Sequence, residues 1–399
     1  VNLTGVSAGR YVPAGPQAYG RDVTSEMWIN QTNLTAYFDT LGLGHTLVTG
    51  VEVSREDYYR NTYNHALNFA GKDYDLGNPP GYYAGATSKT RTAETSTELE
   101  NQAVYAFDTI ALNQQWDLSL GLRYDWIKGD SKNTALPAGT TTRLSSRDKE
   151  LSGRAGVVYK PAENGRIYLA YGTSFNPAAE ALASSGSLNA AAAELDPEEN
   201  KTWELGTKWE LLDNRLQLDA ALFRVEKTNA RETMADGSTE LAGEQRVQGV
   251  ELGVSGRISE QWNVYANYTF LDSETLKAAD TAAGIAKEGQ ALGNTPPRSF
   301  NLWSTYELPA GWRVGYGARY ASERNVTSSD NAKLDAYWVH NAMVGYKVNQ
   351  ELDLQLNMNN LFDKDYVQSV RQNVGLNTRS SAIEYGDARS AVLSATYRF

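Results

Sequence analysis

The sequence contains no cysteine and only 3 histidines among its 399 residues. A disulfide framework and a thiolate-bound metal are therefore excluded, and cysteine usage gives no indication of the redox compartment. The histidines, His45, His65 and His340, lie far apart on different predicted elements, and none has the spacing of a metal ligand. We expect His45, beside a predicted tight turn, to be structural.

Long hydrophobic runs and an excess of basic charge are also missing. No apolar run approaches the ~18 residues that a membrane-spanning helix needs, so a helical membrane protein is excluded. With 37 Lys and Arg against 48 Asp and Glu, the net charge is -11, which argues against a nucleic-acid partner. The mean hydropathy is -0.51. A membrane β-barrel remains open, because alternating strands dilute hydropathy to an ordinary soluble value.

The chain has no G-x-S-x-G elbow and no phosphate-binding loop, and we therefore expect no enzyme. No linker, low-complexity run or change of composition divides it, so residues 1–399 are predicted to form one unit. Val1 is neither an initiator Met nor the start of a signal peptide. The chain is expected to be a mature product or an excised piece.

The final stretch, Ser390–Phe399, reads S-A-V-L-S-A-T-Y-R-F, and its alternate residues fall on opposite faces. This period of two is typical of a β-strand, and it recurs along the chain. It predicts about fifteen strands: Met27–Asp39, His45–Tyr58, Glu98–Leu112, Trp116–Ile127, Leu151–Pro161, Arg166–Ser174, Trp203–Leu212, Arg215–Lys227, Gln245–Ile258, Trp262–Asp272, Arg298–Leu308, Trp312–Ala321, Ala336–Val348, Leu352–Asn360 and Ser390–Phe399.

The connections between these strands alternate between tight turns and long loops. Long polar loops are predicted at Tyr59–Ser96, Lys128–Asp148 and Phe175–Asn200, and the Ala-rich patch Ala190–Ala193 in the last is expected to form a helical turn. Short turns at one end and long loops at the other are typical of outer-membrane barrels, whose turns are periplasmic and whose loops are extracellular.

One strand shows how the two faces differ. Trp116, Leu118, Leu120, Leu122, Tyr124 and Trp126 form an apolar face with aromatic ends, opposite Asp117, Ser119, Gly121, Arg123 and Asp125. The strands beginning at Trp262, Trp312 and Leu352 repeat the pattern. This is about one tilted strand across a bilayer, with a wet or protein-filled lumen behind it. A soluble sandwich or propeller would not explain the aromatic ends or the one-sided loops.

Several motifs, in the same order, resemble the barrel of TonB-dependent siderophore receptors. They are H-T-L-V-T-G-V-E at His45–Glu52, G-L-R-Y-D at Gly121–Asp125, Y-G-T-S-F-N-P at Tyr171–Pro177, L-D-P-E-E-N-K-T-W-E-L-G-T-K at Leu195–Lys208, G-V-E-L at Gly249–Leu252, N-L-F-D-K-D-Y at Asn360–Tyr366 and the terminal Y-R-F. The loop containing Phe175-Asn176-Pro177, followed by A-E-A-L, is most similar to receptors for catecholate-type ferric siderophores.

The resemblance implies a barrel of about 22 strands closed by an N-terminal plug that carries the TonB box. We expect this sequence to depart from that pattern, without the plug domain and the TonB box and with about seven strands fewer. The predicted fold is an all-β, transmembrane antiparallel β-barrel, represented by its C-terminal strands with the plug absent. Two unpaired edges are not tolerated in hydrocarbon, so this part is not expected to seal a barrel alone.

The function that the resemblance implies is active uptake of a ferric siderophore, of catecholate type, across the outer membrane of a Gram-negative bacterium. The expected partners are the ferric siderophore, the TonB complex acting through the plug, and outer-membrane lipid, with the receptor a monomer. No cofactor is expected, since the iron arrives chelated in the siderophore. The alternative is a passive porin, whose sixteen to eighteen strands and open channel also match the raw strand count.

Two sets of residues are binding candidates. The first set lies in the stretch from Tyr58 to Arg91, at the end of the second strand and in the predicted loop, and offers aromatic faces and cations to an anionic, aromatic chelate: Tyr58, Tyr59, Arg60, Tyr63, Tyr82, Tyr83 and Arg91. The alternative is that these tyrosines pack the loop against its neighbours. The second set is predicted to face the lumen or the plug: Arg123, Arg154, Lys208, Arg313 and Arg319. Acidic residues on the same face suggest mutual pairing or plug docking.

Overall fold

The computed structural model describes residues 6–12, 18–67, 73–78, 87–178, 195–233, 239–326, 333–372 and 381–399. One antiparallel sheet of 15 strands dominates it, with consecutive strands of the sheet as neighbours. These strands correspond one to one to those predicted, which confirms the all-β antiparallel prediction. They are β2 (Ala18–Thr40), β3 (Leu43–Leu67), β5 (Thr87–Ala111), β6 (Trp116–Ala135), β7 (Thr140–Ala162), β8 (Gly165–Asn176), β9 (Glu198–Leu211), β10 (Leu216–Thr233), β11 (Thr239–Arg257), β12 (Trp262–Lys277), β13 (Arg298–Glu307), β14 (Trp312–Ala321), β17 (Tyr337–Lys347), β18 (Leu352–Asn359) and β21 (Ser390–Tyr397).

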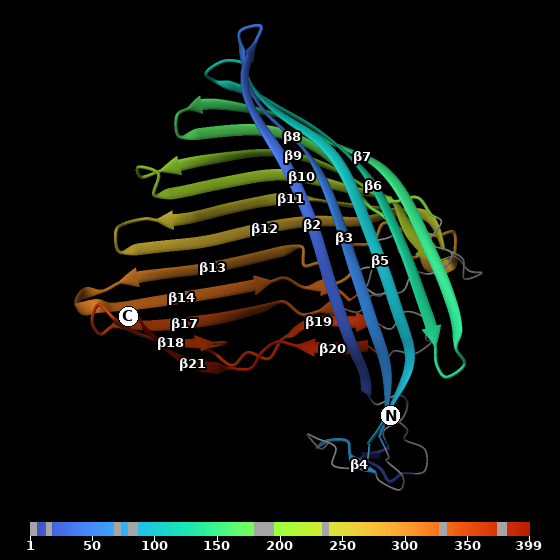
Figure 1. Cartoon of the computed structure of the whole chain (residues 1–399). Helices are drawn as coiled ribbons and strands as arrows, with labels where there is room; N and C mark the ends of the chain where they lie inside the picture. Colours follow the sequence, from blue (N-terminus) through green and yellow to red (C-terminus); the bar gives the residue numbers. More distant parts are fainter. Residues whose placement is uncertain are drawn as a thin grey trace.

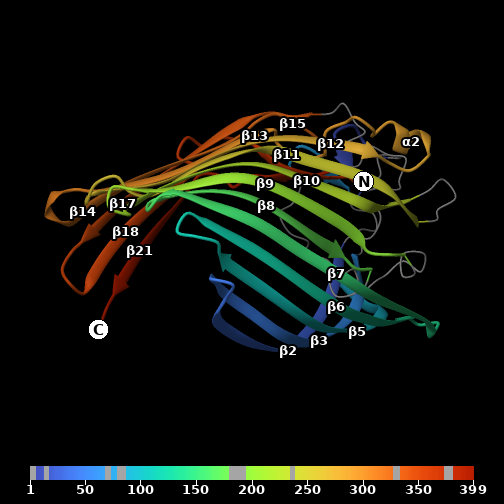
Figure 2. The ribbon, with the colours of Figure 1, turned by 90° about the horizontal axis from the view of Figure 1, so that it is seen from above.

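The sheet is strongly bent. In Figure 1, the strands β2, β3, β5, β6 and β7 run steeply, whereas the strands of the sheet from β8 to β21 lie flatter. Seen from above, the sheet curves into an open trough (Figure 2). Strands β2 and β21 are its two edges, and among the described residues neither pairs with a further strand of the sheet.

Tight turns connect the strand pairs at one edge of the sheet, which we call the turn end. Three of these turns have the same side-chain cap. The Asn113 Oδ1 accepts hydrogen bonds from the N–H groups of residues 115 and 116 at 2.8 and 3.1 Å. Asn349 caps residues 351 and 352 in the same way, and the Ser259 hydroxyl caps residues 261 and 262. Such side chains mimic a backbone turn, which explains why these short connections close so tightly.

At the opposite edge, the loop end, the strands run further than predicted. The predicted loop Lys128–Asp148 is wrong: β6 continues to Ala135 and β7 begins at Thr140. The predicted loop Tyr59–Ser96 is wrong in part, because β3 reaches residue 67 and β5 starts at residue 87. These extensions are polar on both faces, so they lack the alternation that marks a half-buried strand, although the backbone ladder continues unchanged. The patch Ala190–Ala193 lies outside the described residues.

Short elements cover part of the loop end. β1 (Arg10–Tyr11) pairs with β4 (Tyr74–Asp75), β15 (Arg324–Asn325) with β16 (Lys333–Leu334), and β19 (Val367–Gln372) with β20 (Ser381–Tyr385). The helical elements are α2 (Ala282–Ile285) and the 3-10 turn η2 (Pro309–Gly311). Among the described residues, no helix is long and apolar enough to cross a membrane. The rings of Tyr337 and Tyr366 pack here with their centres 4.5 Å apart, beside the buried Ala321 and Val339.

One face of the sheet carries a broad apolar surface, and we call it the outer face. Leu169 of β8 pairs with Leu205 of β9, which pairs with Leu222 of β10. These leucines are 50%, 47% and 53% exposed. Rows of exposed leucines this wide mark a surface that contacts another apolar phase.

Aromatic pairs border the apolar surface on both sides. At the turn end, Trp116 packs against Tyr159 at 4.6 Å, and Trp312 packs against Tyr346 at 4.5 Å. Toward the loop end, Tyr171 and Trp203 lie 4.3 Å apart, and Tyr320 and Trp338 lie 4.8 Å apart. Ten residues separate Trp116 from Trp126 on one strand, which at ~3.3 Å per residue and a tilt of ~40° gives ~25 Å, the height of the apolar band of outer-membrane barrels.

Candidate functional site

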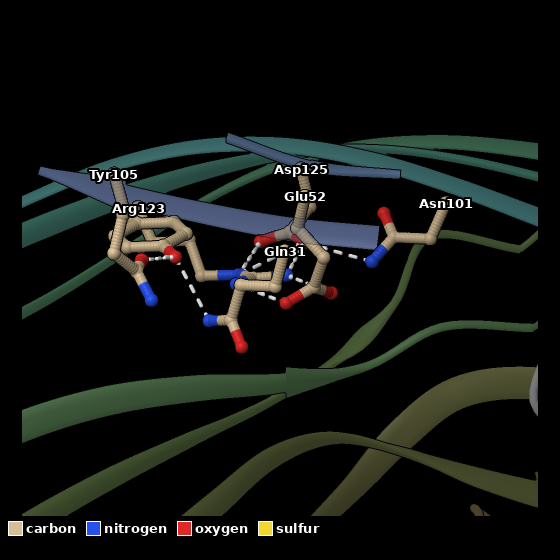
Figure 3. Close-up of polar contacts among 7 residues, drawn as sticks. Gln31, Glu52, Asn101, Tyr105, Arg123 and Asp125 are labelled. Atoms are coloured by element: carbon tan, nitrogen blue, oxygen red, sulfur yellow. Dashed lines mark hydrogen bonds and ion pairs between the residues drawn. The ribbon is translucent and has the colours of Figure 1, made fainter. Parts of the chain in front are cut away.

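The five predicted lumen-facing cations lie on the face opposite the apolar surface. The ladder register establishes this, because directly paired residues share a face. Gly121, two residues from Arg123, pairs with Arg154. Lys208 pairs with Asp219, and Arg319 pairs with Asn301. Figure 3 shows Arg123 and its partners turned toward the strands across the trough, so we call this the inner face. Contact with a plug stays a prediction.

Arg123 of β6 joins three strands on the inner face (Figure 3). Its guanidinium donates to Glu52 of β3 at 2.9 Å and to Asp125 of β6 at 2.8 Å. Asp125 is 3% exposed and also accepts from the Asn101 amide of β5 at 3.2 Å. Since each carboxylate receives a charged donor, the cluster is electrically satisfied within the wall.

Tyr105 of β5 extends this cluster toward the edge strand β2. The Arg123 guanidinium lies 5.5 Å from the centre of its ring. The Tyr105 hydroxyl accepts from the Gln31 amide at 2.8 Å and donates to Asn33. Four strands, β2, β3, β5 and β6, are thereby connected by side chains as well as by their backbones.

Aromatic rings lie flat on the inner face wherever a glycine leaves room. A Cβ at Gly121 would stand 2.2 Å from the Phe107 ring, and the Arg154 guanidinium lies 4.1 Å from the centre of that ring. Gly206 makes the same room for Tyr168. The Tyr168 hydroxyl donates to Glu204 at 2.5 Å. These rings form a flat, polar lining rather than a packed core.

The remaining two predicted cations lie on β14. The Arg313 guanidinium donates to the Gln355 amide oxygen at 3.1 Å and lies 3.8 Å from Asp353. Arg319 donates to the Tyr337 hydroxyl at 3.0 Å. Mutual pairing, one of the two predicted alternatives, is therefore present for Arg123 and Arg313.

The described ligand-binding candidates are on strands and not in a loop, which corrects their predicted placement. Tyr58, Tyr59, Arg60 and Tyr63 belong to β3, and Arg91 belongs to β5. Alternation along β3 puts the even residues, like Glu52, on the inner face and the odd ones on the outer face. Tyr58 and Arg60 therefore share the inner face and Tyr59 and Tyr63 the outer.

Arg91 completes the outer group, because it pairs with Tyr63 in the ladder and donates to Asn61 at 3.2 Å. The described members of the predicted set are thus divided between two surfaces and do not form one site. Tyr82 and Tyr83 lie outside the described residues. A ligand-binding role for any of these residues stays a prediction.

Sequence reasoning missed a charged cluster at the loop end. Glu198, at the start of β9, accepts from the Lys227 ammonium at 2.7 Å, from the backbone N–H of Arg231 at 3.0 Å and from the Asn176 amide at 3.1 Å. Burial alone would raise the pKa of Glu198, but these donors outweigh burial and lower it. The only signal in the sequence was the position of Glu198 within the L-D-P-E-E-N-K-T-W motif.

The N-L-F-D-K-D-Y motif has a structural explanation. Asn360 is 3% exposed with a φ of 47°, and its amide donates to the carbonyl groups of Lys364 and Asp387. The Asn360 Oδ1 accepts from the Lys364 N–H at 2.8 Å. Asparagine tolerates the left-handed conformation and supplies all three bonds, so it fixes the path of the chain beyond β18.

Among the described residues, no group of three or more His, Cys, Asp or Glu side chains is arranged to hold a metal. Two histidines have partners of their own. The His45 Nδ1 lies 2.7 Å from an Asp108 carboxylate oxygen, and its ring stacks on Phe38. The His340 Nδ1 lies 2.7 Å from the Tyr316 hydroxyl.

Comparison with known proteins gives consistent matches. The family model described as TonB dependent receptor-like, beta-barrel matches residues 2–361. The catecholate siderophore receptor Fiu of Escherichia coli O157:H7 is 35% identical over 413 residues, covering 95% of this chain and 52% of that protein. The probable TonB-dependent siderophore receptor PiuA of Acinetobacter baumannii is 32% identical over 402 residues, covering 94% and 53%.

Solved structures give the same result. The crystal structure of the siderophore receptor PiuA from Acinetobacter baumannii superposes with a TM-score of 0.84 at 31% identity, covering 94% of this chain and 56% of that one. The ferric-catecholate import receptor Fiu from E. coli K12, in its closed form, gives 0.81 at 32% identity, covering 95% and 55%. The chain spans about half the length of the curated relatives it matches.

Proposed function

Because the chain belongs to the family of TonB-dependent receptor β-barrels, we propose that it contributes barrel wall to a receptor that imports a ferric siderophore of the catecholate type. Receptors of this family lie in the outer membrane of Gram-negative bacteria, and that is the location of this chain. The turn end is then periplasmic and the loop end extracellular, as the asymmetry of the connections favours. Residues 1–399 act in it as one barrel domain.

The observation that carries the proposal is the contrast between the two faces. The outer face offers exposed leucines bordered by aromatic pairs, which suits lipid. The inner face offers flat aromatic rings and cations, with Arg123 and Arg313 paired inside the wall. Because these ion pairs are already formed between strands of the sheet, the inner face serves as a scaffold. Substrate capture is therefore assigned to the loop end.

The catecholate assignment has two supports. The names of relatives at 32–35% identity include a catecholate siderophore receptor. On the inner face toward the loop end, Tyr58 and Arg60 of β3 offer an aromatic ring and a cation to a chelate that is aromatic and multiply anionic. Stacking and cation–π contacts contribute about 0.5–2 kcal/mol each, and they distinguish such a chelate from an uncharged one.

Transport in this proposal is physical and not chemical. The ferric chelate binds at the loop end, and a plug domain energised through TonB opens the way past the inner face. No bond is made or broken, so no enzymatic activity and no resident cofactor is required, and the iron remains a part of the substrate. The receptor acts as a monomer embedded in lipid.

A passive porin is the weaker candidate. Its strand count is close to that of the sheet, but the named relatives are siderophore receptors and their family is one of transport receptors. The loop end also carries more structure than a simple pore needs, with the pairs β15–β16 and β19–β20 packed over it.

The test uses the complete receptor in an iron-starved strain that lacks its own siderophore receptors. Uptake of radioactive iron is measured from a ferric catecholate and from a ferric hydroxamate, with TonB present and deleted. We expect TonB-dependent uptake of the catecholate. Equal uptake of both chelates removes the catecholate assignment alone. Uptake that does not need TonB, together with leakage of small unrelated solutes, favours the porin.

A further inference from the structure

The apolar outer row of β6 ends at Trp126, and the surface changes character immediately beyond it. On the outer face of the extended β6–β7 hairpin lie five cations, which we call the basic strip: Lys128, Lys132, Arg143, Arg147 and Lys149. Strand alternation puts all of them on the same face as Trp126. The strip therefore begins where the apolar band stops, on the side of the loop end.

The ladder register places like charges directly opposite each other. Lys132 pairs with Arg143, and Lys128 pairs with Arg147. Like charges at directly opposed positions of a sheet are destabilising. Lys128 is relieved by Asp130, whose carboxylate lies 2.7 Å from its ammonium. Among the described residues, the other four cations of the strip have no ion-pair partner.

Nearby acids do not neutralise the strip. Glu98 is engaged by Arg55 of β3 at 3.0 Å. Asp148 belongs to the opposite face, where it accepts from the Ser146 hydroxyl at 3.0 Å. Glu100 remains, pairing in the ladder with Lys128. Five cations thus lie beside Asp130 and Glu100, which leaves a local excess of positive charge on the outer face of a chain whose net charge is -11.

The outer surface is hollowed at the strip. One hollow of about 350 Å³ is lined by Trp126, Lys128, Arg147 and Lys149 together with Glu100 and Gln102. A neighbouring hollow of about 400 Å³ is lined by Lys132 and Arg143, together with Glu98, Asp130 and Ser145. An indole at the apolar border, with cations above it, matches an amphiphile whose anionic group sits directly above its acyl chains.

We propose that the basic strip binds the phosphate groups of a phosphorylated outer-leaflet glycolipid. At ~3.3 Å per residue and a tilt of ~40°, Lys128 lies ~5 Å and Lys132 ~15 Å beyond the Trp126 level, which is the layer of lipid headgroups. The bound phosphates offset the repulsion between the opposed cations. The basic strip thus anchors the extended β6–β7 hairpin at the membrane surface. This inference rests on the outer-membrane placement in the proposed function.

The experiment uses the complete receptor purified in a neutral detergent. Binding of a bis-phosphorylated lipid A is titrated at low and high salt and compared with its enzymatically dephosphorylated form. The test variant is Arg143→Gln with Arg147→Gln. The matched control is Arg224→Gln with Arg246→Gln, two arginines of the same outer face that are already paired with Glu226 and Glu274.

We expect the test variant, which loses two cations, to bind the phosphorylated lipid about thirtyfold more weakly, since each cation near a charged membrane surface contributes about 1 kcal/mol. The control variant is expected to bind the phosphorylated lipid with an affinity within threefold of wild type. For the dephosphorylated lipid, which binds more weakly, the test variant and wild type are expected to differ by less than threefold. Raised salt weakens wild-type binding, because these charges are exposed.

A second readout separates binding from folding. Without lipid, the test variant melts at the same temperature as wild type or higher, because the like-charge repulsion is gone; with lipid, its melting temperature rises less than that of wild type. Equal losses in test and control variants overturn the proposal. The proposal is also overturned if wild type binds the dephosphorylated lipid, or a soluble sugar phosphate without acyl chains, as tightly as the phosphorylated lipid. Siderophore uptake by the wild-type receptor is measured separately. Normal uptake without binding of the phosphorylated lipid means that the lipid proposal fails while the proposed transport function stands.

Discussion

Replacing Arg123 by Met should destabilise the sheet strongly, because it leaves two carboxylates without their charged partner. Arg123 is the charged donor to both Glu52 and Asp125, and Asp125 is 3% exposed. Removing one partner of a buried ion pair typically costs about 3–5 kcal/mol, most of it from the charge left behind. We expect a loss of this size in the free energy of unfolding, measured by denaturant titration of the complete receptor in lipid vesicles.

Two further variants test the reasoning. Arg154→Met removes a cation of the same face that stacks on Phe107, and it leaves no carboxylate behind; we expect a loss of about 1 kcal/mol. The triple variant Arg123→Met, Glu52→Gln and Asp125→Asn also removes the two unpaired negative charges and should recover most of the lost free energy of unfolding. A single Arg123→Met variant no less stable than Arg154→Met, or a triple variant no better than the single one, would refute the electrostatic explanation.

The same variants separate wall pairing from plug docking. If Arg123 acts within the wall, receptors that do fold should bind and import the siderophore with unchanged affinity. Loss of TonB-dependent uptake in a variant with normal unfolding free energy would instead assign Arg123 to contact with the plug. Uptake is normalised to the amount of folded receptor, so a lower amount of receptor does not affect the comparison.

Three other predictions follow from the two ends and two faces. A protease site inserted at Asn78 should be cleaved on intact cells and one at Asn113 should not, because the proposed topology places the turn end in the periplasm; the reverse pattern would invert that topology. Tyr58→Ala should weaken catecholate binding by about tenfold, whereas Tyr59→Ala on the outer face serves as its control and should change it little. The folded-state pKa of Glu198 is lowered, so its contribution to stability is full above the unfolded pKa of about 4.3 and is lost below it. The melting temperatures of wild type and Glu198→Gln should therefore converge from about pH 6 to about pH 3; a constant difference contradicts the assignment.

The strand order could be predicted because it depends on local signals. An aromatic residue after a tight turn, followed by alternating apolar residues, marks Trp116, Trp262 and Trp312 as strand starts without any knowledge of neighbours. Each such strand contacts an apolar phase on one face only. Its apolar residues therefore recur with a period of two, wherever the strand lies in the chain. The motif residues gave the family for the same reason, since they are contiguous in the chain.

Three features were decided by the tertiary structure alone. The extended hairpin Lys128–Asp148 is polar on both faces, so pairing between backbones and not side-chain pattern makes it a strand pair. The division of Tyr58 from Tyr59 depends on which face of β3 is inside, and a single-residue shift of register would reverse it. Arg123 reaches Glu52, 71 residues away, only because β5 lies between β3 and β6 in register. Sequence fixes the period of a strand, but the partners of its side chains depend on the alignment of strands distant in the chain.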